Sequence, residues 1–182
     1  MTFCTLFSCL YGGFDSGVVV RIFNRMVIFY AIMICSMSKQ NTRLESIAKI
    51  LIINDDGNVL TLTLSEHLKH PERSYQPDLP GGIVDAGEPE NLGVIREVQE
   101  ECRIDLDPAK IQLAYAETTY DEKENKSVTK LLYVTHLDNT PAVTLSWEHS
   151  DYKWVSVAEL HNIDLRPFFN RAIQYIVAHK II

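Results

Sequence analysis

Three glutamates on one face of a predicted helix constrain most strongly what this chain can fold into. The sequence predicts a helix from Pro89 to Cys102, with Pro89 suited to a first-turn position. Glu97, Glu100 and Glu101 stand three and four positions apart, so their side chains share one helical face. Like charges at this spacing repel and destabilise a bare helix, so the fold must either leave them in water or place a cation against them.

The residues alone leave both interpretations of this acidic cluster open. An isolated acidic run is more often a solvated helix face than a binding site. If a cation is bound, the oxygen-only ligands favour a hard ion such as Mg²⁺ or Mn²⁺ rather than zinc. The four cysteines contain no Cys-x-x-Cys pair, which also argues against a zinc site.

The spacing of the surrounding residues shifts the balance towards the metal site. The pattern joins a glycine, an arginine, four glutamates and an aliphatic residue, at positions Gly82, Glu88, Arg96, Glu97, Glu100, Glu101 and Ile104. Five residues separate the glycine from the first glutamate, and seven separate that glutamate from the Arg-Glu pair. Six fixed residue types at fixed offsets should occur by chance in about one in 10⁵ chains of this length.

This segment resembles the Nudix box, whose pattern is G-x5-E-x7-R-E-U-x-E-E-x-G-U, with U a bulky aliphatic residue. The preceding segment, Leu79-Pro80-Gly81-Gly82, is similar to the strand that leads into the box in that family. The later segment from Glu148 to Leu160 is also similar to a segment of the family. The resemblance covers roughly residues 46–182. It implies an α/β fold, the Nudix-type α/β/α sandwich with a mixed central sheet.

One position departs from the family pattern, which has a glycine where this chain has Arg103. That glycine ends the helix, where a left-handed backbone is common. A non-glycine residue adopts this conformation at a cost of roughly 1 kcal/mol. We therefore expect Arg103 to weaken the helix end without affecting a metal ligand.

The resemblance implies a metal site built from the helix and the glycine loop. Glu97 and Glu101 would bind the metal directly, and Glu100 would bind it directly or through water. The backbone carbonyl of Gly82 could supply another oxygen. Mg²⁺ is the expected cofactor, with Mn²⁺ as the alternative. Gly81 and Gly82 are expected to bring the loop over the helix and to contribute to substrate binding.

The resemblance also implies catalytic roles for Glu100, Glu88, Arg96 and Glu148. Arg96 would orient a glutamate through a charge-assisted bond rather than contact the substrate. Glu88 would steady the junction between loop and helix or support a water on the metal. The reaction needs a general base, for which Glu148 is the main candidate and His149 a weaker one.

The implied function is Mg²⁺-dependent hydrolysis of a phosphoanhydride bond in a nucleoside diphosphate linked to another group. The alternative is a catalytically weak Nudix-fold sensor that binds nucleotides. A third interpretation, an enzyme like isopentenyl-diphosphate isomerase, would need a catalytic cysteine, and Cys102 lies on the box helix instead.

Several aromatic and basic side chains are candidates for stacking on a base or contacting phosphate, although each could instead pack in the core or be solvated. They are Tyr75, Tyr115, Tyr120, Trp147, Lys49 and Lys130. Trp154 is expected to pack in the core.

The net charge of −7 argues against a nucleic-acid partner bound through a basic surface. An acidic protein can still bind a phosphorylated small molecule, because a metal neutralises the substrate locally. The lone body cysteine, Cys102, is typical of a reduced, cytoplasmic protein. A homodimer is compatible with the sequence.

The composition changes near Met37. Residues 1–36 are apolar and hold one acid, Asp15, and two strong bases, Arg21 and Arg25. We expect residues 1–36 to be an extension outside the native protein and residues 37–182 to form the Nudix domain. A targeting or membrane-associated segment and an ordered extra element are the alternatives. Membrane association of residues 18–37 is not expected, since the two arginines would enter the bilayer.

The remaining elements follow from periodicity and turn residues. Strands are expected at residues 46–54, 59–64, 111–120, 127–137 and 152–155, with a tight turn at 55–58, a loop at 65–79 and a charged hairpin tip at 121–126. Val157 to Leu160 should start a helix or turn. The last helix, Arg166 to His179, should turn one apolar stripe to the core.

Overall fold

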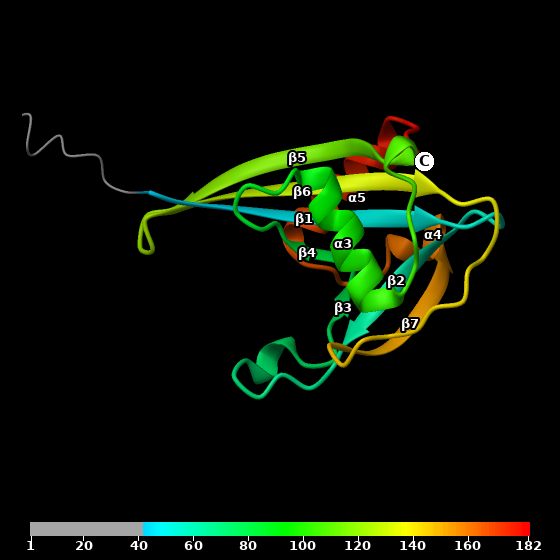
Figure 1. The fold of residues 1–182 in the computed structure, drawn as a ribbon, viewed down its shortest axis with the longest axis horizontal. Helices are drawn as coiled ribbons and strands as arrows, with labels where there is room; N and C mark the ends of the chain where they lie inside the picture. The colour runs from blue at the N-terminus through cyan, green and yellow to red at the C-terminus, as the bar shows by residue number, and fades with distance from the viewer. Residues whose placement is uncertain (1–41) are drawn as a thin grey trace, which may run out of the picture. The chain divides into compact units, whose positions relative to one another are not determined.

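The aliphatic run near residue 50 forms β1 (Arg43–Ile53), the strand around which the sheet is built. In the computed structural model, which describes residues 42–182, β1 pairs in parallel with β6 (Lys126–His136) along its whole length. On its other side β1 pairs antiparallel with β4 (Gly81–Ile83) and, at its end, with β2 (Asn58–Leu64). Strand β4 thereby lies beside the middle of β1 (Figure 1).

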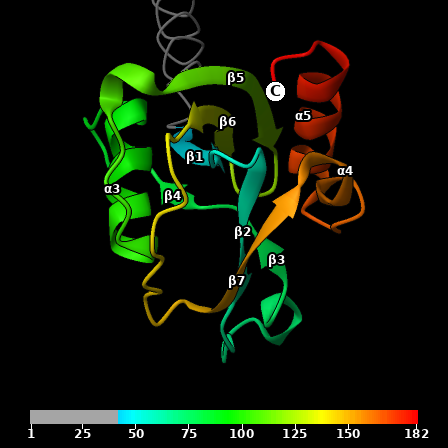
Figure 2. The same cartoon turned by 90° about the vertical axis from the view of Figure 1, so that its right-hand side faces the viewer.

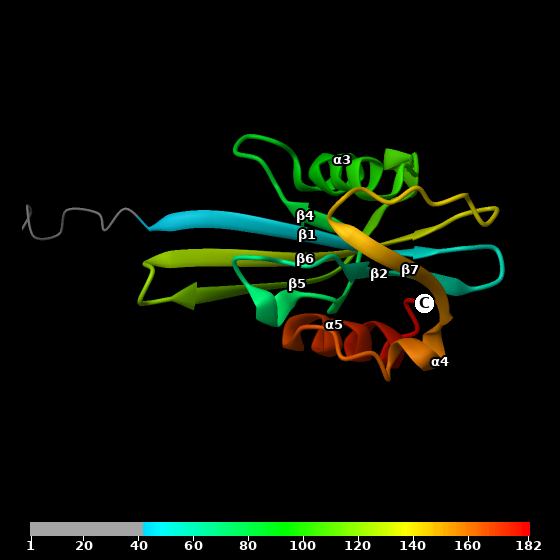
Figure 3. The ribbon, with the colours of Figure 1, turned by 90° about the horizontal axis from the view of Figure 1, so that it is seen from below.

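The sheet has seven strands and is mixed. Strand β2 continues the sheet by pairing antiparallel with β3 (Pro77–Asp78) and β7 (His149–Ser156). Strand β5 (Gln112–Asp121) pairs antiparallel with β6. Helix α3 (Glu90–Cys102) covers one face and α5 (Pro167–Ala178) the other, as Figures 2 and 3 show, while the short α4 (Val157–Leu160) follows β7. The expected α/β/α sandwich is confirmed.

Alternate side chains of β1 supply the two halves of the core. Ile50 and Ile52 pack in the half that contains Val94 and Val98 of α3. Leu51 and Ile53 belong to the half that faces α5, whose buried residues are Phe168, Phe169, Ala172, Ile173 and Ile176. A strand covered on both faces needs a continuous apolar run, which is what the sequence provides. The predicted core stripe of the last helix is confirmed.

The expected strands are all present, with small shifts at their ends. Strand β7 begins three residues earlier than predicted, at His149, because it extends its pairing with β2 as far as Leu64. The predicted loop at residues 65–79 contains a 3₁₀ turn, Pro71–Arg73, and the two-residue β3, and to that extent the prediction was wrong. Pro89 is the residue that precedes the first turn of α3, since its ψ of 134° is extended.

Arg103 ends α3 in the left-handed conformation expected for the position, with φ 57° and ψ 32°. Its backbone N–H donates to the carbonyl of Gln99 at 3.1 Å. The helix end is thus closed in the way a glycine would close it, and the departure from the family pattern leaves the helix intact.

The expectations for residues 1–36 and for a start at Met37 lie outside the described residues. Between residues 42 and 182, no helix is long and apolar enough to cross a membrane.

Candidate active site

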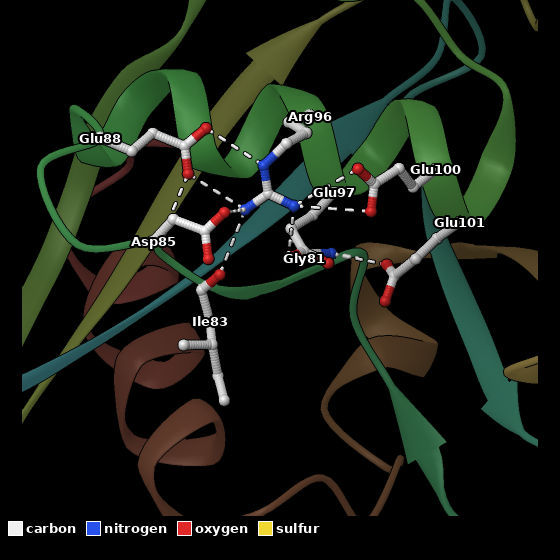
Figure 4. Close-up of polar contacts among 8 residues, drawn as sticks. All are labelled: Gly81, Ile83, Asp85, Glu88, Arg96, Glu97, Glu100 and Glu101. Atoms are coloured by element: carbon white, nitrogen blue, oxygen red, sulfur yellow. Dashed lines mark hydrogen bonds and ion pairs between the residues drawn. The ribbon is translucent and has the colours of Figure 1, made fainter.

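Helix α3 is fixed to strand β4 by Glu101. The Oε2 atom of Glu101 accepts a hydrogen bond from the backbone N–H of Gly81 at 2.8 Å (Figure 4). Gly81 has φ +115°, and a Cβ there would collide with the carbonyl oxygen of Ala48. Only glycine therefore lets β4 come close enough to β1 and α3 for this bond to form.

The carboxylate of Glu97 lies directly against Gly82. A Cβ at Gly82 would stand 2.5 Å from Oε2 of Glu97. The absent side chain thus leaves the backbone of Gly82 and the carboxylate of Glu97 next to each other. One expected metal ligand, Glu97, and the residue expected to supply a backbone oxygen, Gly82, therefore lie next to each other.

Arg96 forms the hub of the acidic cluster, as Figure 4 shows. Its Nε donates to Oε1 of Glu88 at 3.1 Å, and its Nη2 donates to Oε2 of Glu88 at 3.0 Å. Its Nη1 donates to Oε1 of Glu97 at 2.9 Å. The two hydrogen bonds from Arg96 are the main reason that the pKa of Glu88 is lowered, so Glu88 stays ionised.

Glu88 also holds the loop before α3. Its Oε2 accepts from the backbone N–H of Asp85 at 3.2 Å, and Arg96 Nη2 donates to the carbonyl of Ile83 at 3.3 Å. These bonds join the loop to the helix at the place where the sequence predicted such a junction. The assignment of catalytic roles to Glu88 and Arg96 stays a prediction.

Glu100 occupies the solvent side of the cluster. Its side chain is 58% exposed, and its two oxygens are each 3.5 Å from Nη1 of Arg96, at the limit of a hydrogen bond. A weakly held, exposed carboxylate can reorient towards an incoming ligand at little cost.

Burial acts against the charge of the other two glutamates. Glu101 is buried, and desolvation raises its pKa to about 7, although Lys49 and the N–H of Gly81 oppose the rise. Desolvation also raises the pKa of Glu97, against the opposing effect of Arg96. Two desolvated carboxylates side by side are a costly arrangement that a cation would stabilise.

The two candidate bases lie next to each other in the chain but in different surroundings. Glu148 is exposed, and its carboxylate makes no hydrogen bond or ion pair within residues 42–182. His149 is only 4% exposed and is therefore a buried residue rather than a solvated loop histidine. Burial lowers the pKa of His149 to about 4, too low for an efficient base at neutral pH.

The comparison with known proteins decides the family of this site. The NUDIX domain family model matches residues 43–176. The chain belongs to the NUDIX domain family. With relatives named as a diphosphatase and a tetraphosphatase, this Nudix chain is an enzyme of the class that hydrolyses phosphorus-containing anhydrides.

Three similar proteins illustrate the match. A Mycobacterium tuberculosis protein named "Putative 8-oxo-dGTP diphosphatase 2" is 31% identical over 109 residues, 59% of this chain and 72% of the relative. A Caenorhabditis elegans asymmetrical bis(5'-nucleosyl)-tetraphosphatase is 32% identical over 90 residues, 50% of this chain and 64% of the relative. The crystal structure of a MutT protein from Methanosarcina mazei Go1 has a TM-score of 0.64 and 26% identity, and covers 78% of this chain and 99% of its own.

The chemistry of the acidic cluster fits a divalent cation. In the described part of the chain, no three His, Cys, Asp or Glu side chains are already arranged as a metal site. The donors that Glu97, Glu101 and Gly82 offer are all oxygens, which suit a hard cation. The carboxylate of Glu97 against Gly82 and the desolvated carboxylate of Glu101 are oxygen donors that such an ion would stabilise.

Cys102 argues against the isomerase-like interpretation of the Nudix fold. It is fully buried on α3, and this burial is the main reason that the pKa of its thiol is raised to about 12. A protonated, inaccessible thiol cannot act as a nucleophile or acid at neutral pH.

The sequence analysis did not predict a buried ionic network that lies next to the acidic cluster. Asp78 Oδ2 accepts from Nζ of Lys49 at 2.9 Å, and its Oδ1 accepts from Nη2 of Arg166 at 3.0 Å. Lys49 and Asp78 are both about 5% exposed at their side chains. Lys49 is thus neither solvated nor free to meet a phosphate. A lone cation inside the aliphatic strand was the signal that could have predicted a buried ion pair.

The substrate-contact candidates separate into packed and exposed side chains. Tyr115 packs against Phe168 at a ring distance of 5.7 Å, and Trp154 packs against the core half of α3, as predicted. Lys130 lies over the ring of Phe168 at 5.7 Å. The exposed candidates are Tyr75, Tyr120 and Trp147.

Proposed function

We propose that this chain is a Mg²⁺-dependent nucleotide pyrophosphohydrolase. It would cleave a phosphoanhydride bond in a nucleoside diphosphate linked to another group. The observation that carries the proposal is the desolvated pair Glu97 and Glu101, held against the side-chain-free backbone of Gly81 and Gly82. This arrangement costs stability unless a cation binds there.

The residues around the cluster divide the work. Glu97 and Glu101 would hold the cation, and the exposed carboxylate of Glu100 would be available to it from the solvent side. When bound, Mg²⁺ activates water and neutralises charge that develops on the phosphoryl oxygens. Arg96 orients Glu97 while Glu88 holds Arg96 in place.

The general base is a separate residue in this proposal. Glu148 has an exposed carboxylate that is free of partners in the described structure, so it can accept a proton from water. It follows Trp147, which is 86% exposed, on the loop that leads into β7. Buried His149 does not compete for this role because its pKa is too low.

The names of the relatives support nucleotides with a phosphate chain as the substrate class. One relative is named for 8-oxo-dGTP and another for bis(5'-nucleosyl) tetraphosphates. Both names describe a nucleoside joined to at least one phosphoanhydride. We therefore propose this substrate class for the chain, acting in the cytoplasm.

A panel assay with the full-length chain tests the proposal. Nucleoside triphosphates, 8-oxo-dGTP, dinucleoside polyphosphates, nucleotide sugars and capped RNA are each incubated with Mg²⁺ and, in parallel, with EDTA. We expect release of phosphate, pyrophosphate or a nucleotide from one class, and no release in EDTA. Flat activity over the whole panel, with nucleotide binding retained, would favour a sensor without turnover.

A further inference from the structure

His149 begins strand β7 and buries its ring beside the metal-site glutamate Glu101. The side chain of His149 is 1% exposed, and its Nε2 lies 3.9 Å from Oε1 of Glu101. Neither ring nitrogen has a hydrogen-bond partner among the described residues. A buried histidine with two unpaired nitrogens is unusual, because native proteins pair most buried polar atoms.

The unpaired nitrogens carry an energetic cost that points to a missing partner. Leaving a buried polar group without a hydrogen bond costs about 1–3 kcal/mol. A distance of 3.9 Å is too long for a hydrogen bond, yet a small side-chain shift or one intervening water would close it. Within residues 42–182, the one ion-pair contact of the ring is with Oε1 of Glu101.

The imidazole ring of His149 can meet Glu101 as a hydrogen-bond donor. A neutral imidazole carries an N–H on one of its two nitrogens. The nitrogen that faces Glu101 is Nε2. The tautomer with its proton on Nε2 can therefore donate to the carboxylate.

The carboxylate of Glu101 has room for both a donor and a cation. Its Oε2 already accepts from the N–H of Gly81, while its Oε1 faces His149. A carboxylate offers about four acceptor positions. Two donors would therefore fix its orientation and leave two positions free for a metal.

We propose that His149 is a positioning residue for Glu101, donating its Nε2–H to Oε1 directly or through one water. This inference rests on the proposed function, in which Glu101 holds the metal. Gly81 of β4 and His149 of β7 then each donate a hydrogen bond to the carboxylate, one to each of its oxygens. The β2–β7 pairing thereby contributes to metal affinity.

Two substitutions separate the N–H donor from the bulk of the ring. His149→Gln keeps a side-chain N–H, whereas His149→Leu keeps an apolar side chain of similar size without a donor. His161→Leu, at an exposed histidine, is the matched control. The dissociation constant for Mn²⁺ is measured in the full-length chain without nucleotide, from the EPR signal of the free ion, and urea unfolding reports folding.

We expect His149→Leu to weaken Mn²⁺ binding about tenfold to a hundredfold, the usual effect of losing an outer partner of a ligand. His149→Gln should stay within about threefold of the parent protein, because it restores the donor. Unchanged Mn²⁺ binding in folded His149→Leu would overturn the inference. Equal weakening by both substitutions, matched by equal losses in unfolding free energy, would also overturn it, since the ring would then act only by packing.

Failure of this inference is distinguishable from failure of the proposed function. If Glu101→Gln abolishes Mn²⁺ binding but His149→Leu does not, the metal site stands and only the positioning role falls. If the parent protein does not bind Mn²⁺ at all, both are overturned.

Discussion

The backbone N–H of Gly81 donates to the carboxylate of Glu101 across 20 residues of sequence. This bond sets the depth at which α3 lies over β4. It brings Glu97 against Gly82 as well, because the two glutamates are one helical turn apart. The position of the acidic cluster is thus fixed by backbone contacts before any ligand arrives.

Replacing Glu97 or Glu101 by Gln should reduce Mg²⁺-dependent turnover at least about a hundredfold, since a neutral amide is a poor ligand for a hard cation. Folding should persist, because in Glu101→Gln the amide oxygen of the new side chain can still accept from Gly81. Turnover of the best substrate in the panel and urea unfolding are the two measurements. Glu90→Gln, at an exposed position in the first turn of α3, is the control and should keep its activity. Unchanged turnover in both Glu97→Gln and Glu101→Gln would remove the metal-site assignment.

The two neighbouring glycines should respond differently to alanine. Gly81→Ala should lower the free energy of unfolding by roughly 1–3 kcal/mol or more. Its φ is unfavourable for a residue with a side chain, and the new Cβ would collide with the backbone of Ala48. In Gly82→Ala the three atoms nearest to the new Cβ belong to the flexible end of Glu97, so the substitution should displace that carboxylate and weaken Mn²⁺ binding with little loss of stability. Urea unfolding and Mn²⁺ affinity, measured on both variants, separate the two effects. The same profile for both glycines would contradict this account.

Arg103→Gly should stabilise the protein by up to about 1 kcal/mol, because glycine adopts the left-handed backbone without strain. For a domain of this size the midpoint of thermal unfolding would rise by about 2–4 °C. Arg103→Ala keeps the strain and should give no such gain. Turnover should not change in either variant, since Arg103 makes no hydrogen bond or ion pair with the cluster residues in the described structure. A large loss of activity would show that its side chain has a role in the site.

Asp78→Asn should destabilise the protein by about 3–5 kcal/mol at pH 7, because it leaves the buried Lys49 without its counter-charge. Urea unfolding measures the loss. Glu117→Gln, which breaks the more exposed pair with Arg171, is the control and should cost about 1 kcal/mol or less. Similar losses in the two variants would argue against a special role for the buried network.

The same pair predicts a pH dependence with a definite sign. Burial raises the pKa of Asp78, but Lys49 and Arg166 more than offset it, so the folded-state pKa lies below the ordinary 3.8. The stabilisation is then fully present above pH 3.8 and is lost as the pH falls through the folded-state pKa. The difference between parent and Asp78→Asn should therefore be constant from pH 7 to about 5 and shrink towards pH 3. A difference that grows on acidification would contradict this sign.

Most of the fold could be predicted because its signals are local. The apolar run of β1, the turn at Gly57 and the stripe of α5 each depend on residues close in sequence. The acidic face of α3 is equally local. These elements carry their own periodicity or turn chemistry, so the sequence alone indicates them.

The surroundings of the site could not be predicted, because they depend on pairing between distant strands. His149 is buried only since β7 extends along β2 to Leu64. Lys49 meets Asp78 through β3, a strand of two residues with no periodicity to detect. Gly81 reaches Glu101 through the register of β4 on β1. Which polar groups face each other is set by these registers and not by any single segment.

Arg96 has a consequence for how the chain is made. Its guanidinium already donates hydrogen bonds to Glu88 and Glu97 beside the acidic cluster. Part of the repulsion within α3 is therefore offset by a charge that the polypeptide itself supplies. A newly synthesised chain can complete this helix from its own residues. Under the proposed function, cation supply would then govern when the enzyme works rather than whether it folds.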